Sequence, residues 1–278
     1  MSYLVTTEWL NENLHDENLR IVDCRFELGQ PEQGRKEYYE SHIPGAVHVD
    51  LEKDLSDSPA VHGGRHPLPD MEEFADFISE LGIDKDTKVI AYDDQGGAMA
   101  ARFWWMLLYL GHPNVYVLNQ TFTSWKKKGY PVTEEIPSIE KRYFFADKEP
   151  RLLVHLEEVK VALHEEDKVL IDGRDEIRYK GIRDEVDPVA GHIPGARHYF
   201  WKKVLTEEGK WKESEELQSH FSGLSHSDEI ISYCGSGVTA AANVLALKEA
   251  GFENVRLYAG SWSDWSSYPD LPYETDKS

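Results

Sequence analysis

The chain contains the stretch His42-Ile43-Pro44-Gly45-Ala46 and repeats it unchanged as His192-Ile193-Pro194-Gly195-Ala196. A second pair keeps nearly the same spacing of about 150 residues: Ile-Val-Asp-Cys-Arg at 21–25 matches Leu-Ile-Asp-Gly-Arg at 170–174. Two further pairs follow in the same order, Val-Ile-Ala-Tyr at 89–92 with Ile-Ile-Ser-Tyr at 230–233, and Ser124-Trp125 with Asp264-Trp265. Four matches in one order predict a duplicated domain of roughly 130 residues.

Within each copy, short β-branched runs alternate with longer stretches of helical period. This alternation predicts an α/β fold of two tandem domains, each a parallel sheet flanked by helices. The expected strands are 20–23, 88–92 and 115–118 in the first copy and 168–172, 229–233 and 255–258 in the second, with helices at 71–81 and about 238–250. The expected boundaries are a first domain at 1–140, a linker at 141–150 and a second domain at 151–278.

Composition excludes several classes of partner. The 278 residues carry 30 basic and 51 acidic side chains, a formal charge of −21, so a nucleic acid would be repelled. The most apolar stretch, residues 103–110, is far shorter than the roughly 20 residues of a membrane-spanning helix, so we expect no membrane span. The first residues lack the pattern of a secretory signal, which favours a cytoplasmic location.

The two copies differ where the strand at 229–233 ends. Cys234 follows this strand, whereas Asp93 stands in the same place in the first copy. Gly235 and Gly237 allow the backbone to curl so that its N–H groups point inward, and a helix starting near Val238 adds its positive end. Such a setting lowers a cysteine pKa from about 8.5 to roughly 3.5–7.5, so Cys234 is predicted to be a thiolate that a ligand can reach. The alternative is a small, inert core residue.

Other residues favour structural roles. Cys24 lies in an apolar run and its counterpart is Gly173, so we interpret it as structural. No Cys-x-x-Cys or His-Glu-x-x-His spacing occurs, which argues against a metal site. Tryptophans at helical spacing or beside a terminal strand are predicted to be core, namely Trp104, Trp105, Trp125, Trp262 and Trp265.

On these motifs the chain resembles the tandem-domain rhodanese superfamily, the thiosulfate and 3-mercaptopyruvate sulfurtransferases. The motifs are the paired His-Ile-Pro-Gly-Ala segments, Gly-His-Ile-Pro-Gly at 191–195, Cys-Gly-Ser-Gly-Val-Thr at 234–239, and Gly-Ser-Trp-Ser-Asp-Trp at 260–265. In that family the first domain is catalytically silent and usually has aspartate in place of the cysteine. In this chain Asp93 stands in that place. The resemblance implies that sulfur passes from a small-molecule donor through a Cys234 persulfide to a thiol acceptor such as thioredoxin, or to cyanide, without a metal or organic cofactor.

The resemblance also implies the site residues. Cys234 is the nucleophile, and Gly235, Gly237, Val238 and Thr239 form the binding loop around it. Ser236 handles a proton, assisted by His66 and Asp54 of the first domain, so that the site would lie between the domains. From the residues alone, His66 and Asp54 are equally consistent with ordinary surface-loop positions.

The sequence gives weaker evidence about which sulfur donor is used. The loop at 234–239 carries no cation, which resembles the mercaptopyruvate branch, whereas the thiosulfate branch places cations there. In the mercaptopyruvate branch two arginines hold the keto-acid carboxylate. Arg178 matches the first, but Glu185 occupies the second place, and the nearest arginine is Arg183. We therefore favour 3-mercaptopyruvate with Arg178 and Arg183 as binders; thiosulfate is the alternative donor, and a solvated salt bridge is the alternative role of Arg183.

Two functions of other classes compete with this prediction. Phosphatases and arsenate reductases use a related cysteine loop, but theirs is longer and ends in arginine, whereas the loop at 234–239 is short and lacks one. A non-catalytic binding module would not need the cradle residues, yet Cys234, Ser236, Gly237 and Thr239 are all present.

Overall fold

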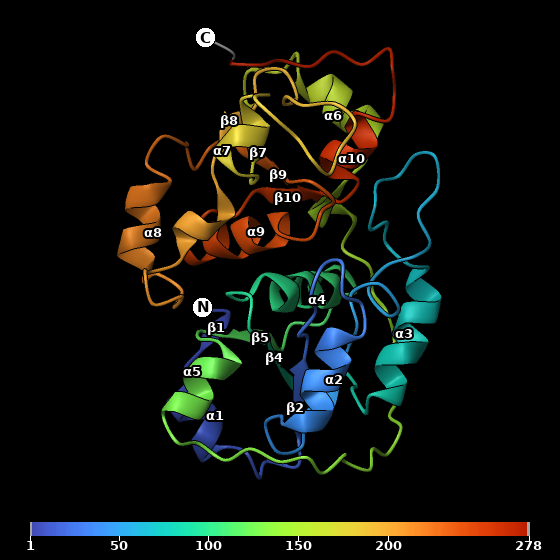
Figure 1. Ribbon diagram of the computed structural model, residues 1–278, viewed down its shortest axis with the longest axis vertical. Coiled ribbons are helices and arrows are strands. Elements are labelled where there is room, and N and C mark those ends of the chain that lie inside the picture. The colour runs from blue at the N-terminus through green and yellow to red at the C-terminus, as the bar shows by residue number, and fades with distance from the viewer. Residues whose placement is uncertain (1, 277–278) are drawn as a thin grey trace. The chain divides into compact units, whose positions relative to one another are not determined.

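The computed structural model describes residues 2–276, which form two compact units (Figure 1). The first unit holds the chain up to residue 57 together with 68–149 and 205–211, and the second holds 58–67, 150–204 and residues from 212 onward. This division places two short segments outside the expected ranges, and it assigns residues 141–149 of the expected linker to the first unit. Residues 58–67 belong to the second unit because they bond to its last helix, and 205–211 belong to the first, where the Trp211 amide donates to the Asn119 carbonyl at 3.2 Å.

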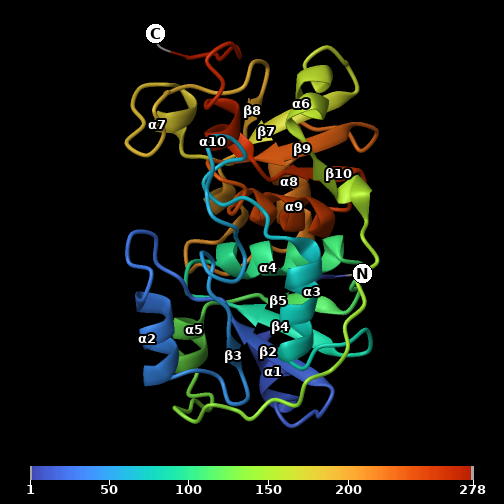
Figure 2. The same cartoon turned by 90° about the vertical axis from the view of Figure 1, so that its right-hand side faces the viewer.

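The first unit is built on a five-stranded sheet in the order β1-β5-β4-β2-β3, with parallel pairing throughout. Its elements are β1 (Leu4–Val5), α1 (Thr7–Glu12), β2 (Leu19–Asp23), α2 (Gln33–Glu40), β3 (Val47–His48), α3 (Met71–Glu80), β4 (Lys88–Tyr92), α4 (Ala98–Tyr109), β5 (Val115–Leu118) and α5 (Phe122–Lys127). Helices α1 and α5 pack with β2 and β4 in one core cluster, while α4 covers the opposite side of the sheet (Figure 2).

The second unit repeats this plan, with the parallel order β6-β10-β9-β7-β8. Its elements are η1 (Pro150–Leu152), β6 (Leu153–Val154), α6 (Leu156–Ala162), β7 (Lys168–Asp172), α7 (Glu176–Tyr179), β8 (Arg197–His198), η2 (Trp201–Val204), α8 (Ser214–His220), β9 (Glu229–Tyr233), α9 (Ala240–Glu249), β10 (Val255–Tyr258) and α10 (Ser261–Trp265). Helices α6 and α10 share a core cluster on one face of the sheet, and α9 lies on the other face (Figure 1).

The predicted fold class, two parallel α/β units, is confirmed. Five of the six expected strands have the expected bounds, and β2 begins one residue earlier at Leu19. The five tryptophans predicted to be core are buried. Among the described residues, no helix has both the length and the apolar character needed to cross a bilayer.

The repeated His-Ile-Pro-Gly-Ala segment has the same contacts in both units. In the first, the His42 ring stacks on Tyr38 at 4.0 Å and the Tyr38 hydroxyl donates to the Ala46 carbonyl at 2.8 Å. In the second, His192 stacks on Tyr179 at 4.0 Å and the Tyr179 hydroxyl donates to the Ala196 carbonyl at 2.7 Å. The motif therefore binds the turn before the short edge strand to the preceding helix.

A buried ion pair stands at the carboxyl end of the second strand in each unit. Arg25 Nη2 is 2.6 Å from Asp23 Oδ2, and Arg174 Nη2 is 2.8 Å from Asp172 Oδ2. Each guanidinium also lies over an aromatic ring, Phe122 at 4.2 Å in the first unit and its counterpart Trp262 at 4.6 Å in the second. The repeated Asp-x-Arg sequence thus encodes a buried pair that joins strand to helix.

We expect Arg25→Ala to lower the free energy of unfolding by about 3–5 kcal/mol, because it leaves the Asp23 carboxylate buried without its cation. Urea denaturation followed by circular dichroism would measure the change. The matched control is Lys36→Ala, which removes an exposed cation 3.9 Å from Glu40 and should cost no more than about 0.5 kcal/mol. Equal losses in the two variants would contradict a structural role for the buried pair.

Candidate active site

Cys234 lies at the carboxyl end of β9, the central strand of the second sheet. Its amide donates to Ser261 Oγ at 3.0 Å, and its carbonyl accepts from the Trp262 amide at 3.0 Å. The next carbonyl, of Gly235, accepts from the Ser263 amide at 2.9 Å. The first turn of α10 therefore fixes the backbone on both sides of the thiol, and Ser261 adopts a left-handed φ of 56° to do so.

Within the loop at 234–239, Gly237 has the left-handed backbone conformation that favours glycine. Gly237 has a φ of 78°, and a Cβ atom there would collide with the Ala259 carbonyl, so only glycine fits. Val238 is buried, and Thr239 is the N-cap residue of α9 without a side-chain capping bond. The helix begins at Ala240, two residues later than expected, because the loop uses residues 238 and 239 to complete its turn.

The matching loop of the first unit already holds a carboxyl group. Asp93 Oδ1 accepts from the amides of Gln95 at 2.9 Å and Gly97 at 2.7 Å. Its Oδ2 accepts from the amides of Met99 at 2.8 Å and Ala100 at 3.0 Å. Burial raises the pKa of Asp93, and these four N–H donors act against that rise. In the first unit, the loop after the central strand therefore directs four amides at Asp93, the residue that Cys234 replaces in the second unit.

Ser236 and His66 meet beside Cys234. The Nδ1 of His66 is 2.8 Å from Ser236 Oγ, and both residues are 7 % exposed. A buried hydroxyl bonded to an imidazole can pass a proton between a reacting group and the ring. The two residues that the resemblance pairs for proton handling are thus in direct contact.

The segment 58–67, which carries His66, docks on α10. The Gly63 amide donates to Asp264 Oδ1 at 2.7 Å, and the Arg65 amide donates to Ser263 Oγ at 3.1 Å. Next to them, the His62 ring stacks on Tyr268 at 3.9 Å. Since these contacts precede and follow Gly64, they fix the direction in which Arg65 and His66 leave the backbone.

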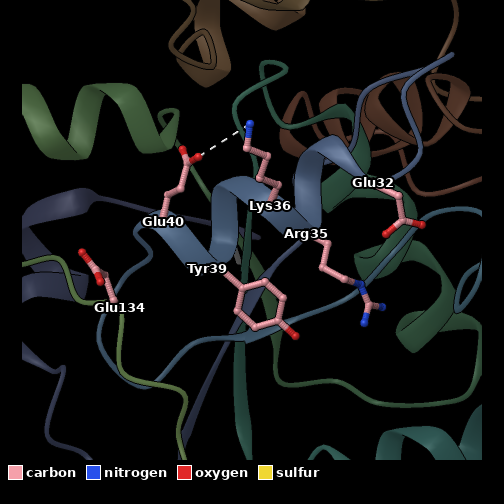
Figure 3. A pocket seen from close by; sticks show the side chains of 6 residues that line it. All are labelled: Glu32, Arg35, Lys36, Tyr39, Glu40 and Glu134. Carbon is pink, nitrogen blue, oxygen red and sulfur yellow. Dashed lines mark ion pairs between the residues drawn. The ribbon is translucent and has the colours of Figure 1, made fainter.

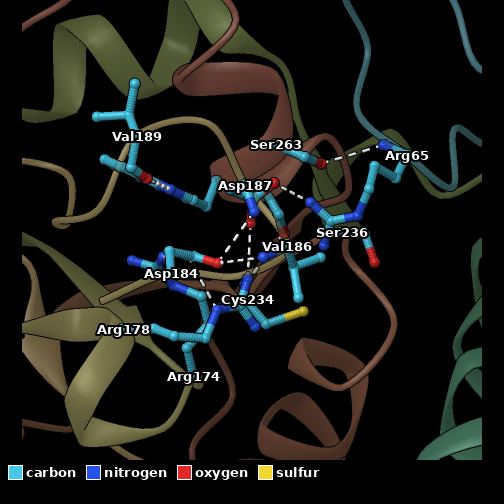
Figure 4. Close-up of polar contacts among 12 residues, drawn as sticks. Arg65, Arg174, Arg178, Asp184, Val186, Asp187, Val189, Cys234, Ser236 and Ser263 are labelled. Carbon is cyan, nitrogen blue, oxygen red and sulfur yellow. Dashed lines mark hydrogen bonds and ion pairs between the residues drawn. The ribbon is translucent and has the colours of Figure 1, made fainter. Parts of the chain in front are cut away.

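An arginine–aspartate cluster lies next to the cysteine loop (Figure 4). Arg178 donates from Nε to Asp184 at 2.9 Å and from Nη2 to Asp187 at 2.6 Å. Arg174 Nη1 lies 3.4 Å from Asp184, and Arg65 Nη1 is ion-paired with Asp187. Burial lowers the pKa of Arg65, and the neighbouring Arg178 cation lowers it further.

One expected site residue, Arg183, is not part of this arrangement. Arg183 is exposed and pairs with exposed Glu185 at 3.4 Å, a contact typical of a solvated ion pair, so the structure does not bring it to the Arg178 cluster. Asp54 belongs to the first unit, where its carboxylate accepts from the Asp50 amide at 2.8 Å. Burial raises the pKa of Asp54, and the Asp50 carboxylate adds to that rise.

Sequence reasoning missed Arg65 as a site residue and overestimated access to the thiol. Arg65 lies in a segment whose sequence has neither strand nor helix periodicity. Its separation in sequence from Cys234 does not predict that it lies next to the cysteine loop. Cys234 itself is only 2 % exposed, because the loop and the first turn of α10 close around it.

The other cysteine, Cys24, has different surroundings. It is 1 % exposed, and burial together with the carboxylates of Asp93, Asp23 and Asp54 raises the pKa of its thiol well above the ordinary value. The counterpart Gly173 lies beside the reactive loop, since a Cβ atom there would be 3.7 Å from Cys234 Cβ. The structural role predicted for Cys24 fits this setting.

A surface pocket of about 530 Å³ lies elsewhere, on α2 of the first unit (Figure 3). Its lining is mostly charged and consists of Glu32, Arg35, Lys36, Tyr39, Glu40 and Glu134. Neither cysteine lines it, so the thiol chemistry predicted from the sequence does not take place there.

Similarity to known proteins is consistent with the geometry. The rhodanese-like domain family matches residues 6–128 and 155–268, one match to each copy. The chain belongs to the rhodanese-like family. It is 41 % identical to a probable 3-mercaptopyruvate sulfurtransferase of Pseudomonas aeruginosa, covering 98 % of each chain, and 37 % identical to a thiosulfate sulfurtransferase of Cricetulus griseus, covering 98 % of this chain and 94 % of the other.

Solved structures agree with this assignment. The structure described as a 3-mercaptopyruvate sulfotransferase of Escherichia coli superposes with a TM-score of 0.83 at 35 % identity, covering 95 % of this chain and 100 % of that one. The family, the duplicated fold and the sulfurtransferase class expected from the sequence are thereby confirmed. Because relatives named for either donor have similar identities, overall similarity does not separate the two donors.

We expect Cys24 to resist iodoacetamide in the native protein at pH 7.5, because its raised pKa keeps the thiol protonated and burial blocks the reagent. Peptide mass spectrometry after brief alkylation would report modification at each cysteine. The control is the same reaction in denaturant, where Cys24 should react fully. Rapid native alkylation of Cys24 in a Cys234→Ser background would contradict this account.

Proposed function

We propose that this protein is a sulfurtransferase that takes sulfur from 3-mercaptopyruvate, holds it as a Cys234 persulfide and passes it to a thiol such as thioredoxin or to cyanide. The observation that carries the proposal is the 2.8 Å contact between His66 and Ser236 in the loop that follows Cys234. Ser236 is two residues after the proposed nucleophile, and the intervening Gly235 lies close to the guanidinium group of Arg178.

In the first half-reaction, atoms and charges balance without any cofactor. The Cys234 thiolate attacks the sulfur of 3-mercaptopyruvate, an S–S bond forms, and the carbon–sulfur bond breaks with its electron pair on carbon. The leaving group is the enolate of pyruvate, which takes one proton to become pyruvate. Ser236, bonded to His66, is the group that we propose delivers this proton.

In the second half-reaction the acceptor attacks the outer sulfur of the persulfide. The S–S bond breaks, its electron pair returns to Cys234 as thiolate, and the sulfur leaves on the acceptor; cyanide gives thiocyanate. Both half-reactions keep negative charge on a sulfur next to the loop, so inward-facing amides assist both. In the first unit, four amides of the corresponding loop donate to the Asp93 carboxyl group, which supports the proposal that amides of the Cys234 loop assist both steps.

Thiosulfate is the second candidate donor because several relatives are named for it. Sulfur transfer from thiosulfate releases sulfite directly and needs no proton. The Ser236–His66 pair would therefore have no proton to deliver. The resemblance also implies that Asp54 supports His66, and this role remains a prediction.

Incubation with 3-mercaptopyruvate should add one sulfur, about 32 Da, to Cys234, because the covalent mechanism stores the sulfur there. Intact mass spectrometry followed by peptide mapping would locate it, and cyanide should remove it. Cys24→Ala should gain the same mass, whereas Cys234→Ser should not. A wild-type protein that gains no sulfur from either 3-mercaptopyruvate or thiosulfate would overturn the proposed function.

Ser236→Ala should lower kcat with 3-mercaptopyruvate by about 10²–10³-fold, since the enolate loses its proton donor. The same variant should change thiosulfate turnover by less than about threefold, because sulfite leaves without a proton. Steady-state assays with both donors test the difference, and Ser222→Ala, at a serine outside the site, serves as control. Equal losses with the two donors would mean that Ser236 shapes the loop rather than handling a proton.

A further inference from the structure

Helix α10 holds the segment 58–67 as well as the cysteine loop. The Ser263 hydroxyl oxygen accepts from the Arg65 amide at 3.1 Å, whereas the Ser263 amide donates to the Gly235 carbonyl at 2.9 Å (Figure 4). The helix is therefore a common support for two segments that are far apart in sequence. Its contacts decide where the segment lies relative to the cysteine loop.

The buried carboxylate of Asp264, in α10, is central to this attachment. Its Oδ1 accepts from the Gly63 amide at 2.7 Å, and its Oδ2 accepts from the Tyr258 hydroxyl at 2.6 Å. Asp264 is 6 % exposed and Tyr258 is 1 % exposed. Burial and the Asp264 carboxylate raise the pKa of Tyr258, so its hydroxyl stays protonated and remains a donor. Each carboxylate oxygen thus has a fixed partner, one at the end of β10 and one on the segment.

Two glycines allow the segment and the helix to approach closely. Gly64 has a φ of 88°, and a Cβ atom there would lie 2.5 Å from the Gly260 carbonyl oxygen. A Cβ atom on Gly260 would lie 2.6 Å from Asp264 Oδ2. A side chain at either position would therefore separate the segment from α10 or displace the carboxylate.

The first unit has other residues at both places of the Tyr258–Asp264 pair. Leu118 ends β5 as Tyr258 ends β10, and Ser124 lies in α5 as Asp264 lies in α10. Leucine has no hydroxyl and serine has no carboxylate, so these two side chains cannot form the same bond. The pair accompanies Cys234, and this difference between the copies points to a role that the loop with the thiol requires.

We propose that Asp264 is a positioning residue that anchors the segment 58–67 so that His66 stays in contact with Ser236. This proposal rests on the proposed sulfurtransferase function, in which that contact delivers a proton to the pyruvate enolate. Asp264 acts through the Gly63 amide, three residues before His66. Because a hydrogen bond of 2.8 Å is lost when its atoms separate by about 1 Å more, the anchor of the segment decides whether the pair forms.

Asp264→Ser, which installs the residue of the first unit, should lower kcat with 3-mercaptopyruvate by about 10–100-fold, because the Gly63 amide loses its acceptor and His66 is misplaced. Asp264→Asn keeps an oxygen for that amide and should stay within about fivefold of wild type. The control is Asp270→Ser, at an exposed aspartate outside the site, which should leave kcat within about twofold. Equal losses in Asp264→Asn and Asp264→Ser would overturn the anchoring role.

A kinetic double-mutant cycle separates positioning from a general structural role. In a Ser236→Ala background the Ser236–His66 pair is already broken, so adding Asp264→Ser should lower kcat further by less than about threefold. A merely structural residue would lower kcat by the same factor in both backgrounds. That result would refute the proposal.

Gly64→Ala tests the same attachment from the segment side and leaves the buried Tyr258–Asp264 bond unchanged. The added Cβ would collide with the Gly260 carbonyl, so kcat should fall as it does in Asp264→Ser. Gly29→Ala is the matched control, because Gly29 has a similar φ of 82° and nothing within 4 Å of the added atom. The two glycine variants should therefore differ in kcat by at least about fivefold, and equal values would count against the attachment.

Hydrogen exchange followed by mass spectrometry tests the anchor without using activity. Amides of residues 58–67 should exchange at least about fivefold faster in Asp264→Ser than in wild type, whereas those of α9 should exchange equally in both. If wild-type protein forms the Cys234 persulfide but Asp264→Ser matches it in exchange and in kcat, Asp264 is not a positioning residue and the sulfurtransferase function stands. If wild-type protein forms no persulfide, the function fails, and the proposal fails with it.

Discussion

The buried pair between an aspartate at a strand end and the arginine two residues later is the constraint on which both units depend. Arg25 Nη2 also donates to the Ser41 carbonyl at 2.8 Å, and Arg174 Nη2 donates to the Gly191 carbonyl at 2.5 Å, each just before the repeated His-Ile-Pro-Gly-Ala segment. Such pairs add little net stability but are costly to break, so they fix geometry. Among the described residues, the second unit extends its pair, through Asp184, to Arg178. Arg178 is therefore anchored to the buried framework.

The loops after the central strands of the two units carry different side chains at the same position. In the first unit the Asp93 carboxyl group accepts from four amides. In the second unit Cys234, with a shorter side chain, stands in that place. The residue after the second strand also differs between the units: Cys24 lies beside Asp93, and Gly173 lies beside Cys234. Glycine there gives the reactive sulfur space that a side chain would take.

Local pattern predicted most of the fold, since buried parallel strands appear as β-branched runs, and β4, β5, β7, β9 and β10 have the predicted bounds. Cys234 could be singled out from the sequence because duplication supplied an internal comparison with Asp93. Arg65 could not, because the segment 58–67 has no periodic pattern and its partners, Asp187 and Ser263, are distant in sequence. Arg183 was favoured because it is the arginine nearest in sequence to the expected position. Tertiary contacts, however, decide which residues lie together at the site.

The overall charge and the site charge act over different distances. A formal charge of −21 opposes the approach of any anionic donor, yet screening at physiological salt limits that field to about 8 Å. Within contact distance, the guanidinium groups of Arg65 and Arg178 are the cations beside Gly235, and both are partly shielded from water. In such surroundings a charge interacts more strongly with a nearby anion than it would in bulk water. The few charges around Gly235 therefore outweigh long-range steering for an anion that reaches the loop.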